Sequence, residues 1–473
     1  MNFVSWSFIS LLLVVMAARM SVGRTKVEPA FVWVLIAAST IFYSWHVPVY
    51  IAILLVSAGV DYRAAIALAR TPNEHESRRR AILAVSLVAN LGLLGFFKYA
   101  NLLTDALARA ALAFGVELSA PEVRLILPMG ISFYTFQSMS YTIDVYRGRL
   151  DPLRSFKTFF LYIIFFPQLV AGPIVRALDF LPQMTRPRRL HLKAFYEGAW
   201  LILLGLFFKM VCADNLAVYV DAHWDAGYRE EADAGFAIWL AVMFSGQIFA
   251  DFAGYSNIAR GVAYWLGYRL PVNFNAPYVA ASLKNFWERW HMTLSSWLRD
   301  YLYVPLGGNR RGRVRTYVNL LVVMVLGGLW HGAAYTYIAW GAIHGCALAV
   351  ERMLGLHTDA GLGRVRLVRV AWFLVAQSVV VVAWVFFRSA SIEGAVTFVG
   401  NIAAMDVRPV AGWMWVGTLF LAPLAMHHAW IWAYEHRLVG VLSSGTKAAL
   451  AAVMAYCVAT LYAGTSDFIY FQF

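Results

Sequence analysis

One histidine of this 473-residue chain lies in the middle of a long apolar segment. His331 belongs to the motif Gly327-Gly-Leu-Trp-His-Gly-Ala-Ala334, within the apolar residues 318–338. A polar side chain at membrane depth is costly, and histidine is well suited to moving a proton near neutral pH. The glycines allow a helix or a substrate to approach the backbone closely. The segment predicts proton-transfer chemistry inside a membrane; the simpler alternative is that His331 is a satisfied packing residue.

Residues 271–316 mix tryptophan, charged and hydroxyl side chains at helical spacing. The motifs Phe286-Trp-Glu-Arg-Trp-His291 and Trp297-Leu-Arg-Asp-Tyr-Leu-Tyr303 are too polar to span a membrane. They predict short amphipathic helices that lie at the cytoplasmic surface or line a funnel. His291, taken alone, is also compatible with an interfacial position that has no chemical role.

Four arginines follow these motifs, and they have two explanations. They either set the topology and contact anionic lipid headgroups, or recognise a phosphate-rich cytosolic cofactor. From charge alone the lipid explanation is favoured. The four residues are Arg310, Arg311, Arg313 and Arg315.

Several other kinds of chemistry have no matching pattern. No pair of histidines has metal-ligand spacing with a third ligand nearby, so no metal site is expected. Residues 254–258 lack the second glycine of a nucleophile elbow, and residues 307–312 lack the Lys-Ser/Thr of a phosphate loop. The net charge of +13 comes from lysines and arginines in short loops between apolar runs, which indicates membrane topology and not nucleic-acid binding.

The elements that must position these residues are membrane helices. The chain is 61% hydrophobic and 14% charged, against roughly 45–50% and about 25% for soluble domains. Apolar runs recur from end to end, so we expect an all-α, polytopic membrane protein with one domain over residues 1–473. The expected spans are 2–19, 30–46, 47–60, 81–98, 125–143, 195–212, 234–250, 317–331, 334–350, 370–388, 411–430 and 447–465.

The loops predict an orientation for these spans. Basic clusters at 19–26, 63–80, 147–157, 176–193, 299–315 and 352–369 are expected in the cytoplasm, and the acidic loop 214–233 outside. One apolar segment, 159–175, is flanked by basic loops on both sides. Because Pro167, Gly172 and Pro173 interrupt it, it is expected to be broken, and re-entrant or cytoplasm-facing, in a buried core or cavity wall.

Taken together, the motifs resemble those of the membrane-bound O-acyltransferases. The resemblance is to the bacterial branch that holds the membrane subunits of alginate O-acetylation, peptidoglycan O-acetylation and teichoic-acid D-alanylation. It covers nearly the whole chain and is dense from about 125 to 390, with Asn257 where the alginate-type pattern has Asp. The motifs that carry it begin at Leu127 (Leu-Pro-Met-Gly-Ile-Ser-Phe-Tyr), Phe166 (Phe-Pro-Gln-Leu-Val-Ala-Gly-Pro), Asp251 (Asp-Phe-Ala-Gly-Tyr-Ser-Asn-Ile-Ala), Asn273 (Asn-Phe-Asn-Ala-Pro-Tyr), Phe286, Trp297, Gly328 (Gly-Leu-Trp-His-Gly-Ala) and Trp384 (Trp-Val-Phe-Phe-Arg).

The resemblance implies a fold and a site. The fold would be roughly 11–12 transmembrane helices, with re-entrant and amphipathic helices, around a central funnel or tunnel. His331 would be the catalytic base at the narrow centre, and His291 would line the same cavity and orient the reactants or stabilise oxyanion charge. The arginines at 310–315 would bind the donor. The residues expected to support the tunnel are Trp330, Gly332, Trp290, Asp300, Tyr303, Asp251 and Asn257.

The implied activity is acetyl transfer across the bacterial inner membrane. Acetyl-CoA would be the donor substrate, an acyl carrier protein is an alternative donor, and no cofactor would be bound permanently. A periplasmic transferase would take the acetyl group on to an exported polysaccharide, and membrane lipids are expected partners. Two other classes remain open at this point: a transporter of an acyl donor or lipid-linked sugar, and a scaffold of an export complex.

Overall fold

The computed structural model describes residues 1–21, 29–45, 47–117, 127–185, 191–228, 233–358, 366–404, 412–464 and 468–469. Glu230 and Glu231 of the expected outer loop, and the ends of several expected spans, lie outside these residues. The chain divides into two compact units. Unit 1 contains Met1–Ile202 and Ile258–Pro271, and unit 2 contains Leu203–Asn257 and Val272–Phe473. The one-domain organisation stays a prediction.

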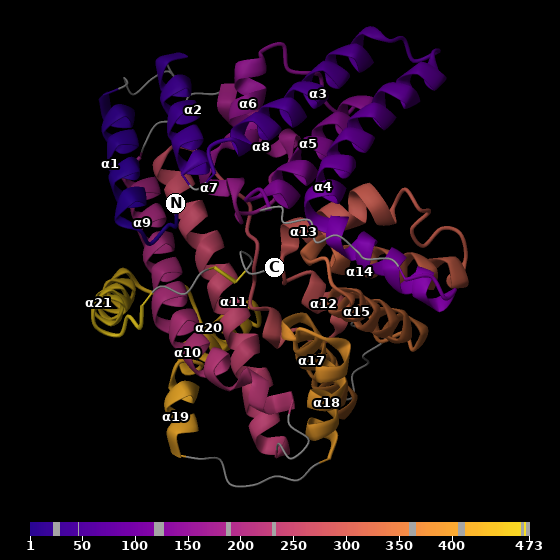
Figure 1. Cartoon of the computed structure of the whole chain (residues 1–473). Coiled ribbons are helices and arrows are strands. Elements are labelled where there is room, and N and C mark those ends of the chain that lie inside the picture. The colour runs from indigo at the N-terminus through magenta and orange to yellow at the C-terminus, as the bar shows by residue number, and fades with distance from the viewer. Residues whose placement is uncertain are drawn as a thin grey trace. The chain divides into compact units, whose positions relative to one another are not determined.

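The described secondary-structure elements of the first unit are all helices (Figure 1). Two further helices, α9 (Leu192–Leu206) and α11 (Ala234–Trp265), contribute only their residues up to Ile202 and from Ile258. The helices wholly within it are α1 (Trp6–Ser21), α2 (Pro29–Ser44), α3 (Tyr50–Arg70), α4 (Glu76–Ala113), α5 (Ile131–Tyr146), α6 (Phe156–Ile164), α7 (Phe166–Leu169) and α8 (Ala177–Thr185).

A buried carboxylate joins three helices of this unit. Asp61 of α3 is fully buried and accepts hydrogen bonds from Ser86 and Asn90 of α4 and from Ser138 and Thr142 of α5. A buried carboxylate is tolerated when donors surround it in this way. This network accounts for the close packing of α3, α4 and α5.

The segment 159–175 is broken and buried, as expected. Its helix stops at Ile164, and the four-residue α7 begins at Phe166 with Pro167 in its first turn, where proline is tolerated. Phe159, Phe165 and Phe166 are all fully buried. The segment forms part of the core of unit 1.

The second unit holds all the candidate site residues. Its described elements are also helices, including the π-helical turns η1 and η4. They are η1 (Phe207–Ala213), α10 (Asp214–His223), η2 (Trp224–Tyr228), the part of α11 up to Asn257, η3 (Pro277–Val279), α12 (Leu283–Trp287), α13 (Met292–Leu298), η4 (Arg299–Tyr303), α14 (Arg313–His331), α15 (Tyr335–Met353), α17 (Arg366–Arg388), α18 (Ile392–Ala403), α19 (Gly412–Leu419), α20 (Ala422–Glu435) and α21 (Ser444–Thr460).

The all-α membrane fold is confirmed. Six helical segments of the described chain are long and apolar enough to cross a membrane. The expectation of 11 to 12 spans around a funnel stays a prediction beyond these six. The six segments are Tyr50–Arg70, Glu76–Ala113, Leu192–Gly227, Ala234–Trp265, Arg313–His331 and Leu367–Arg388.

Three details differ from the sequence-based expectation. The span expected at 47–60 continues to Arg70, because the alanine-rich residues that follow remain helical. The span expected at 411–430 is two helices, α19 and α20, and Pro423 lies in the first turn of α20. The short helices between 283 and 303 were expected at the cytoplasmic surface or lining a funnel. Phe286 and Trp290 lie in the aromatic core of unit 2, and Trp297 is also buried, so these side chains are not on a surface. The funnel lining stays a prediction.

Helices α14 and α15 pack side by side through glycines (Figure 1). A Cβ atom on Gly328 would lie 2.1 Å from the carbonyl oxygen of Tyr337, and one on Gly341 would lie 2.3 Å from that of Met324. Neither position has room for a side chain, so the two backbones can approach closely. This contact positions both the end of α14 and the buried face of α15.

Candidate functional site

His331 is the last residue of α14 and not the middle of a continuous helix. The chain turns into an extended conformation at Gly332 (φ −159°, ψ 154°) before α15 begins at Tyr335. A Cβ atom on Gly332 would lie 2.0 Å from the Tyr337 ring, so the close packing of this turn requires glycine. The Gly-rich motif therefore produces a helix end with a histidine on it.

Aromatic rings surround the imidazole of His331. Its ring centroid lies 5.0 Å from that of Trp330, 5.1 Å from Trp340 and 5.3 Å from Phe387, each nearly edge to face. The side chain is only 5% exposed. Such a setting excludes water and strengthens any electrostatic interaction with a reacting group.

The second predicted histidine also contacts Trp330. The ring centroid of His291 is 6.0 Å from that of Trp330 and 4.7 Å from that of Phe252, and the residue is fully buried. The structure thus brings His291, the residue before α13, into contact with Trp330, which precedes His331 at the end of α14. Trp290, also predicted, is buried and packs on Trp384 at 4.8 Å.

The orientation of His291 is fixed by Asn273. Its Nδ1 lies 3.1 Å from Oδ1 of Asn273, which also accepts hydrogen bonds from the backbone N–H and the hydroxyl of Thr293. Because Asn273 Oδ1 is an acceptor, the neutral His291 ring carries its proton on Nδ1 and has its lone pair on Nε2. Burial lowers the pKa of His291 to about 3, so the ring is neutral at physiological pH.

Two backbone hydrogen bonds between residues 273–275 and residues 289–292 hold Asn273 and His291 in place. Met292 N donates to Asn273 O at 2.9 Å, and Asn275 N donates to Arg289 O at 2.9 Å. The guanidinium of Arg289 makes a two-point ion pair with Glu435 at 3.1 and 2.7 Å, which lowers the pKa of that carboxyl. His291 itself has left-handed backbone angles (φ 41°, ψ 52°), a strained conformation that such surroundings can stabilise.

A third buried histidine lies next to the site and is not among the site residues predicted from the sequence. His344 of α15 is fully buried, stacks on Phe286 at 6.2 Å, and contacts Trp287 at 5.1 Å and Trp340 at 4.9 Å. Among the described residues neither of its ring nitrogens has a hydrogen-bond partner, and the same holds for the indole nitrogens of Trp287 and Trp340. Buried polar groups are nearly always satisfied, so this group is suited to receive polar atoms of a substrate or water. Its signal in the sequence is the i, i+4 spacing of Trp340 and His344 on one helix face.

The predicted donor-binding arginines lie far from His331 along α14. Arg313 is the first residue of this helix and His331 the last, about 27 Å apart along its axis at 1.5 Å per residue. Arg310, Arg311, Arg313 and Arg315 are all exposed. The structure does not bring these arginines next to the histidines.

Two of the predicted supporting residues have local partners outside the histidine site. Asp300 pairs with its neighbour Arg299 at 2.7 and 3.2 Å. Tyr303 is half-buried, and its ring lies against Gly308. Nothing in these contacts connects them to His331.

The remaining two predicted supporting residues, Asp251 and Asn257, lie on α11. Asp251 shares the ammonium group of Lys209 with Asp214, at 2.9 and 2.8 Å, and also accepts the backbone N–H of Ile469 at 2.7 Å. This buried ion cluster braces η1 and α11 one residue before Phe252, the ring that contacts His291. Asn257 is half-buried; its neighbour Ser256 is the residue that bonds Asn273, at 3.3 Å.

The residues that orient the predicted site side chains are not apparent from the sequence motifs. Asn273 opens one of the quoted motifs, yet nothing in that motif assigns it to His291. Glu351 was also missed: it is fully buried and accepts the backbone N–H groups of Leu283 and Lys284 at 2.6 and 3.0 Å and the indole N–H of Trp372 at 3.1 Å. It thereby anchors α12, which carries Trp287.

Comparison with known proteins gives a consistent result. Residues 149–392 match the family model described as MBOAT, membrane-bound O-acyltransferase family. The chain is 40% identical over 374 residues to the "Probable alginate O-acetylase AlgI" of Pseudomonas putida, covering 77% of this chain and 73% of that protein. It is 34% identical over 401 residues to the "Peptidoglycan O-acetyltransferase" of Helicobacter pylori, covering 79% and 73%. It is 29% identical over 233 residues to the "Teichoic acid D-alanyltransferase" of Bacillus subtilis, covering 47% and 58%.

Proposed function

Because the chain belongs to the membrane-bound O-acyltransferase family and is a membrane acyltransferase, we propose that it moves acetyl groups from cytosolic acetyl-CoA to an exported polysaccharide. We place it in the bacterial inner membrane, with a periplasmic transferase as the partner that completes O-acetylation. An alginate-like polymer is the proposed final acceptor, by analogy with the relatives named for alginate. Family membership removes the transporter and scaffold alternatives as the main activity.

The observation that carries the mechanism is the pair of buried histidines whose rings both contact the ring of Trp330. In the proposed reaction His331 removes the proton from the acceptor hydroxyl as its oxygen attacks the thioester carbonyl carbon. The carbon–sulfur bond then breaks, and the proton passes from His331 to the leaving thiolate. General base catalysis of this kind contributes about 10²–10⁴-fold in rate.

The hydrogen bond to Asn273 favours one of the two roles open to His291. An oxyanion needs a hydrogen-bond donor, but the proton of His291 is engaged by Asn273 and its Nε2 is an acceptor. We therefore propose that Nε2 accepts a hydrogen bond from the acceptor and orients it. The indole N–H of Trp340, whose ring contacts His331, is the proposed oxyanion donor.

The two ends of α14 support transfer across the membrane. The helix has 19 residues and is about 28 Å long, close to the roughly 30 Å thickness of the hydrocarbon core. Its basic end is the proposed entry for the donor, whose long, flexible pantetheine arm would carry the thioester toward His331. A long polysaccharide would not easily enter a narrow tunnel, so we propose that a protein hydroxyl of the partner, or a single sugar hydroxyl, receives the acetyl group.

The donor is tested with the purified protein in detergent. Acetyl transfer from radiolabelled acetyl-CoA to a periplasmic extract is measured for wild type, Arg310→Gln/Arg311→Gln, and Lys447→Gln, an exposed basic residue of the same unit. We expect the arginine variant to raise KM for acetyl-CoA several-fold with little change in kcat, and the lysine variant to resemble wild type.

Two outcomes would change the proposal. Transfer from an acetylated acyl carrier protein but not from acetyl-CoA would replace the donor, since a basic surface also docks an acidic carrier. Equal KM values in all three proteins would remove the arginines from donor binding.

A further inference from the structure

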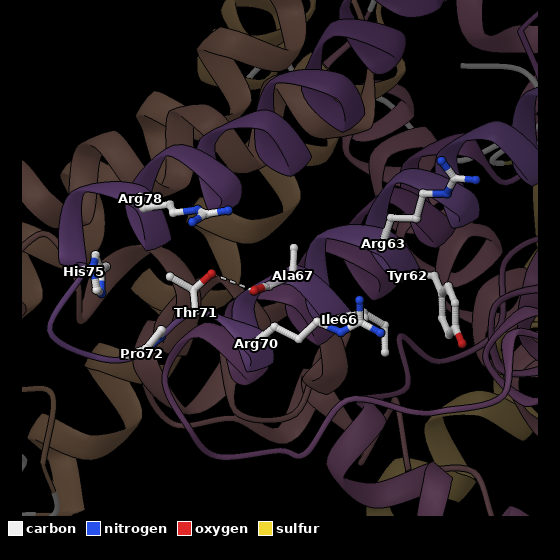
Figure 2. Close-up of a pocket in the computed structure, with 9 residues that line it drawn as sticks. All are labelled: Tyr62, Arg63, Ile66, Ala67, Arg70, Thr71, Pro72, His75 and Arg78. Atoms are coloured by element: carbon white, nitrogen blue, oxygen red, sulfur yellow. Dashed lines mark hydrogen bonds between the residues drawn. The ribbon is translucent and has the colours of Figure 1, made fainter.

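Unit 1 contains a basic pocket. Its lining residues are distant in the sequence from every residue of the proposed site. Its volume is about 440 Å³, within the usual range for small-ligand sites of roughly 300–1,000 Å³. Figure 2 shows Arg78 extending from α4 toward α3, which carries Arg63 and Arg70. None of the described lining residues is acidic; they are Tyr62, Arg63, Ile66, Ala67, Arg70, Thr71, Pro72, His75 and Arg78.

The arginines of this region fall into two groups. Arg79 donates to the carbonyl groups of Leu68, Thr71 and Tyr146 at 2.8, 3.0 and 2.9 Å, so it ties α4 to the end of α3 and to α5. Arg80 pairs with Glu76. The three lining arginines, by contrast, are exposed and form no ion pair among the described residues. Their charge is therefore available to a ligand.

Apolar residues continue from these arginines along the same helix faces. Val56, Arg63 and Arg70 repeat every seven residues on α3, as do Arg78 and Val85 on α4, so each set shares one face. Val56 is 61% and Val85 63% exposed. Val56 lies two helical turns, about 10 Å, from Arg63 on α3, and Val85 lies the same distance from Arg78 on α4. Because Ser86 bonds Asp61 across the two helices, Val85 is near the level of Arg63, and the basic end is formed by Arg70 and Arg78. Both helices are long and apolar enough to span a membrane, so this is the pattern of a membrane–water boundary.

We propose that this pocket binds the phosphate group of an anionic membrane lipid. The guanidinium groups of Arg63, Arg70 and Arg78 would bind the phosphodiester, for which their fork of donors is well matched. The acyl chains would lie along the exposed apolar faces that carry Val56 and Val85. The predicted cytoplasmic position of residues 63–80 agrees with this, because anionic lipids are attracted to basic pockets between membrane helices on that side. A soluble phosphate compound shares the headgroup chemistry and is the other source that the experiment distinguishes.

The experiment measures the melting temperature of the purified full-length protein in detergent. Dioleoylphosphatidylglycerol, dioleoylphosphatidylcholine or inorganic phosphate is added at equal concentration to wild type, Arg70→Gln/Arg78→Gln and Arg80→Gln. Arg80→Gln is the matched control, because it removes a charge from the same helix end but not from the pocket. Arg63→Gln is a second test, should the double variant not fold.

We expect phosphatidylglycerol to raise the melting temperature of wild type and Arg80→Gln, with phosphatidylcholine giving a smaller shift. The double variant should need about tenfold or more of the lipid for the same shift, since each charge-assisted contact is worth about that factor. A shift with inorganic phosphate that the double variant loses would retain the anion site and assign it to a soluble ligand. Equal shifts in all variants, or the same shift with both lipids, would overturn the proposal.

Discussion

At the scale of single residues, the two histidines beside Trp330 differ in what surrounds them. His291 is held by Asn273 through Nδ1, whereas His331 lies in a box of Trp330, Trp340 and Phe387. The sequence predicts both histidines from their motifs. It cannot predict which nitrogen of His291 carries the proton, because Asn273 comes 18 residues earlier and only the folded loop brings it to the ring.

His344 provides a prediction at this scale. His344→Phe keeps an aromatic ring between Phe286 and Trp340 but removes two buried nitrogens. Because replacing an unsatisfied buried polar group by an apolar one is neutral or stabilising, we expect an unchanged or higher melting temperature. If the nitrogens contact the substrate, kcat/KM falls by about 10- to 100-fold, the cost of a displaced substrate. Steady-state kinetics and thermal melts of the same preparation check this; full activity would make His344 a packing residue.

The lowered pKa of His291 predicts how stability depends on pH. The unfolded histidine titrates near its ordinary value of 6.5 and the folded one near 3, so the unfolded state binds more protons between these values. The stability that the neutral, buried ring contributes is complete above about pH 6.5 and is lost as pH falls toward 3. At pH 5.5 the loss from this one group is about 1 kcal/mol.

A matched variant isolates this contribution. His291→Asn removes the titration, tolerates left-handed backbone angles, and can still donate to Asn273. Between pH 7.5 and 5.5 the melting temperature of wild type should therefore fall further than that of the variant. Equal falls would show that His291 is not buried in its neutral form.

At the scale of elements, the site depends on how α14 meets α15. The glycine-rich motif of α14 is visible in the sequence, and close helix packing is a fair expectation from it. The partner glycines, Gly341 and Gly345, lie ten or more residues later and face α14 only because α15 turns back at Gly332. The burial of aromatic side chains in and between α12 and α13 has a related cause. Their polar residues, Arg289 and Asn285 among them, are satisfied by one another and by Glu435, so the tryptophans between them can be buried.

Gly341→Ala tests this contact. The added Cβ would lie 2.3 Å from the Met324 carbonyl oxygen, so the helices must move apart. We expect a loss of about 1–3 kcal/mol in stability, as for overpacked cores, and reduced acyl transfer because His331 and Trp340 move relative to each other. Gly400→Ala on α18 is the control, since nothing lies within 4 Å of its Cβ position, and it should be neutral or slightly stabilising. Similar effects of the two substitutions would contradict this packing argument.

At the scale of the whole molecule, composition and apolar runs predict the all-helical membrane fold correctly. They fail on the exact helix limits, for example at α19 and α20, because a single hydropathy window does not distinguish one span from two shorter helices separated by a turn. The sequence also does not show how far the basic end of α14 lies from His331. This distance follows only once the limits of the helix are known. In the proposed mechanism this separation gives the chain a donor end and a reaction end, as acyl transfer across a membrane requires.

The most direct test of the central claim is the O-acetyl content of the cell's exported polysaccharides. It is compared between wild type, a deletion strain, His331→Ala and His427→Ala at matched protein levels. His427 is the control, a histidine of the same unit that contacts Phe208 and not the site around Trp330. The proposed mechanism predicts that acetylation is lost in the deletion and in His331→Ala and is kept in His427→Ala. Normal acetylation in His331→Ala would contradict the assignment of this histidine as the base.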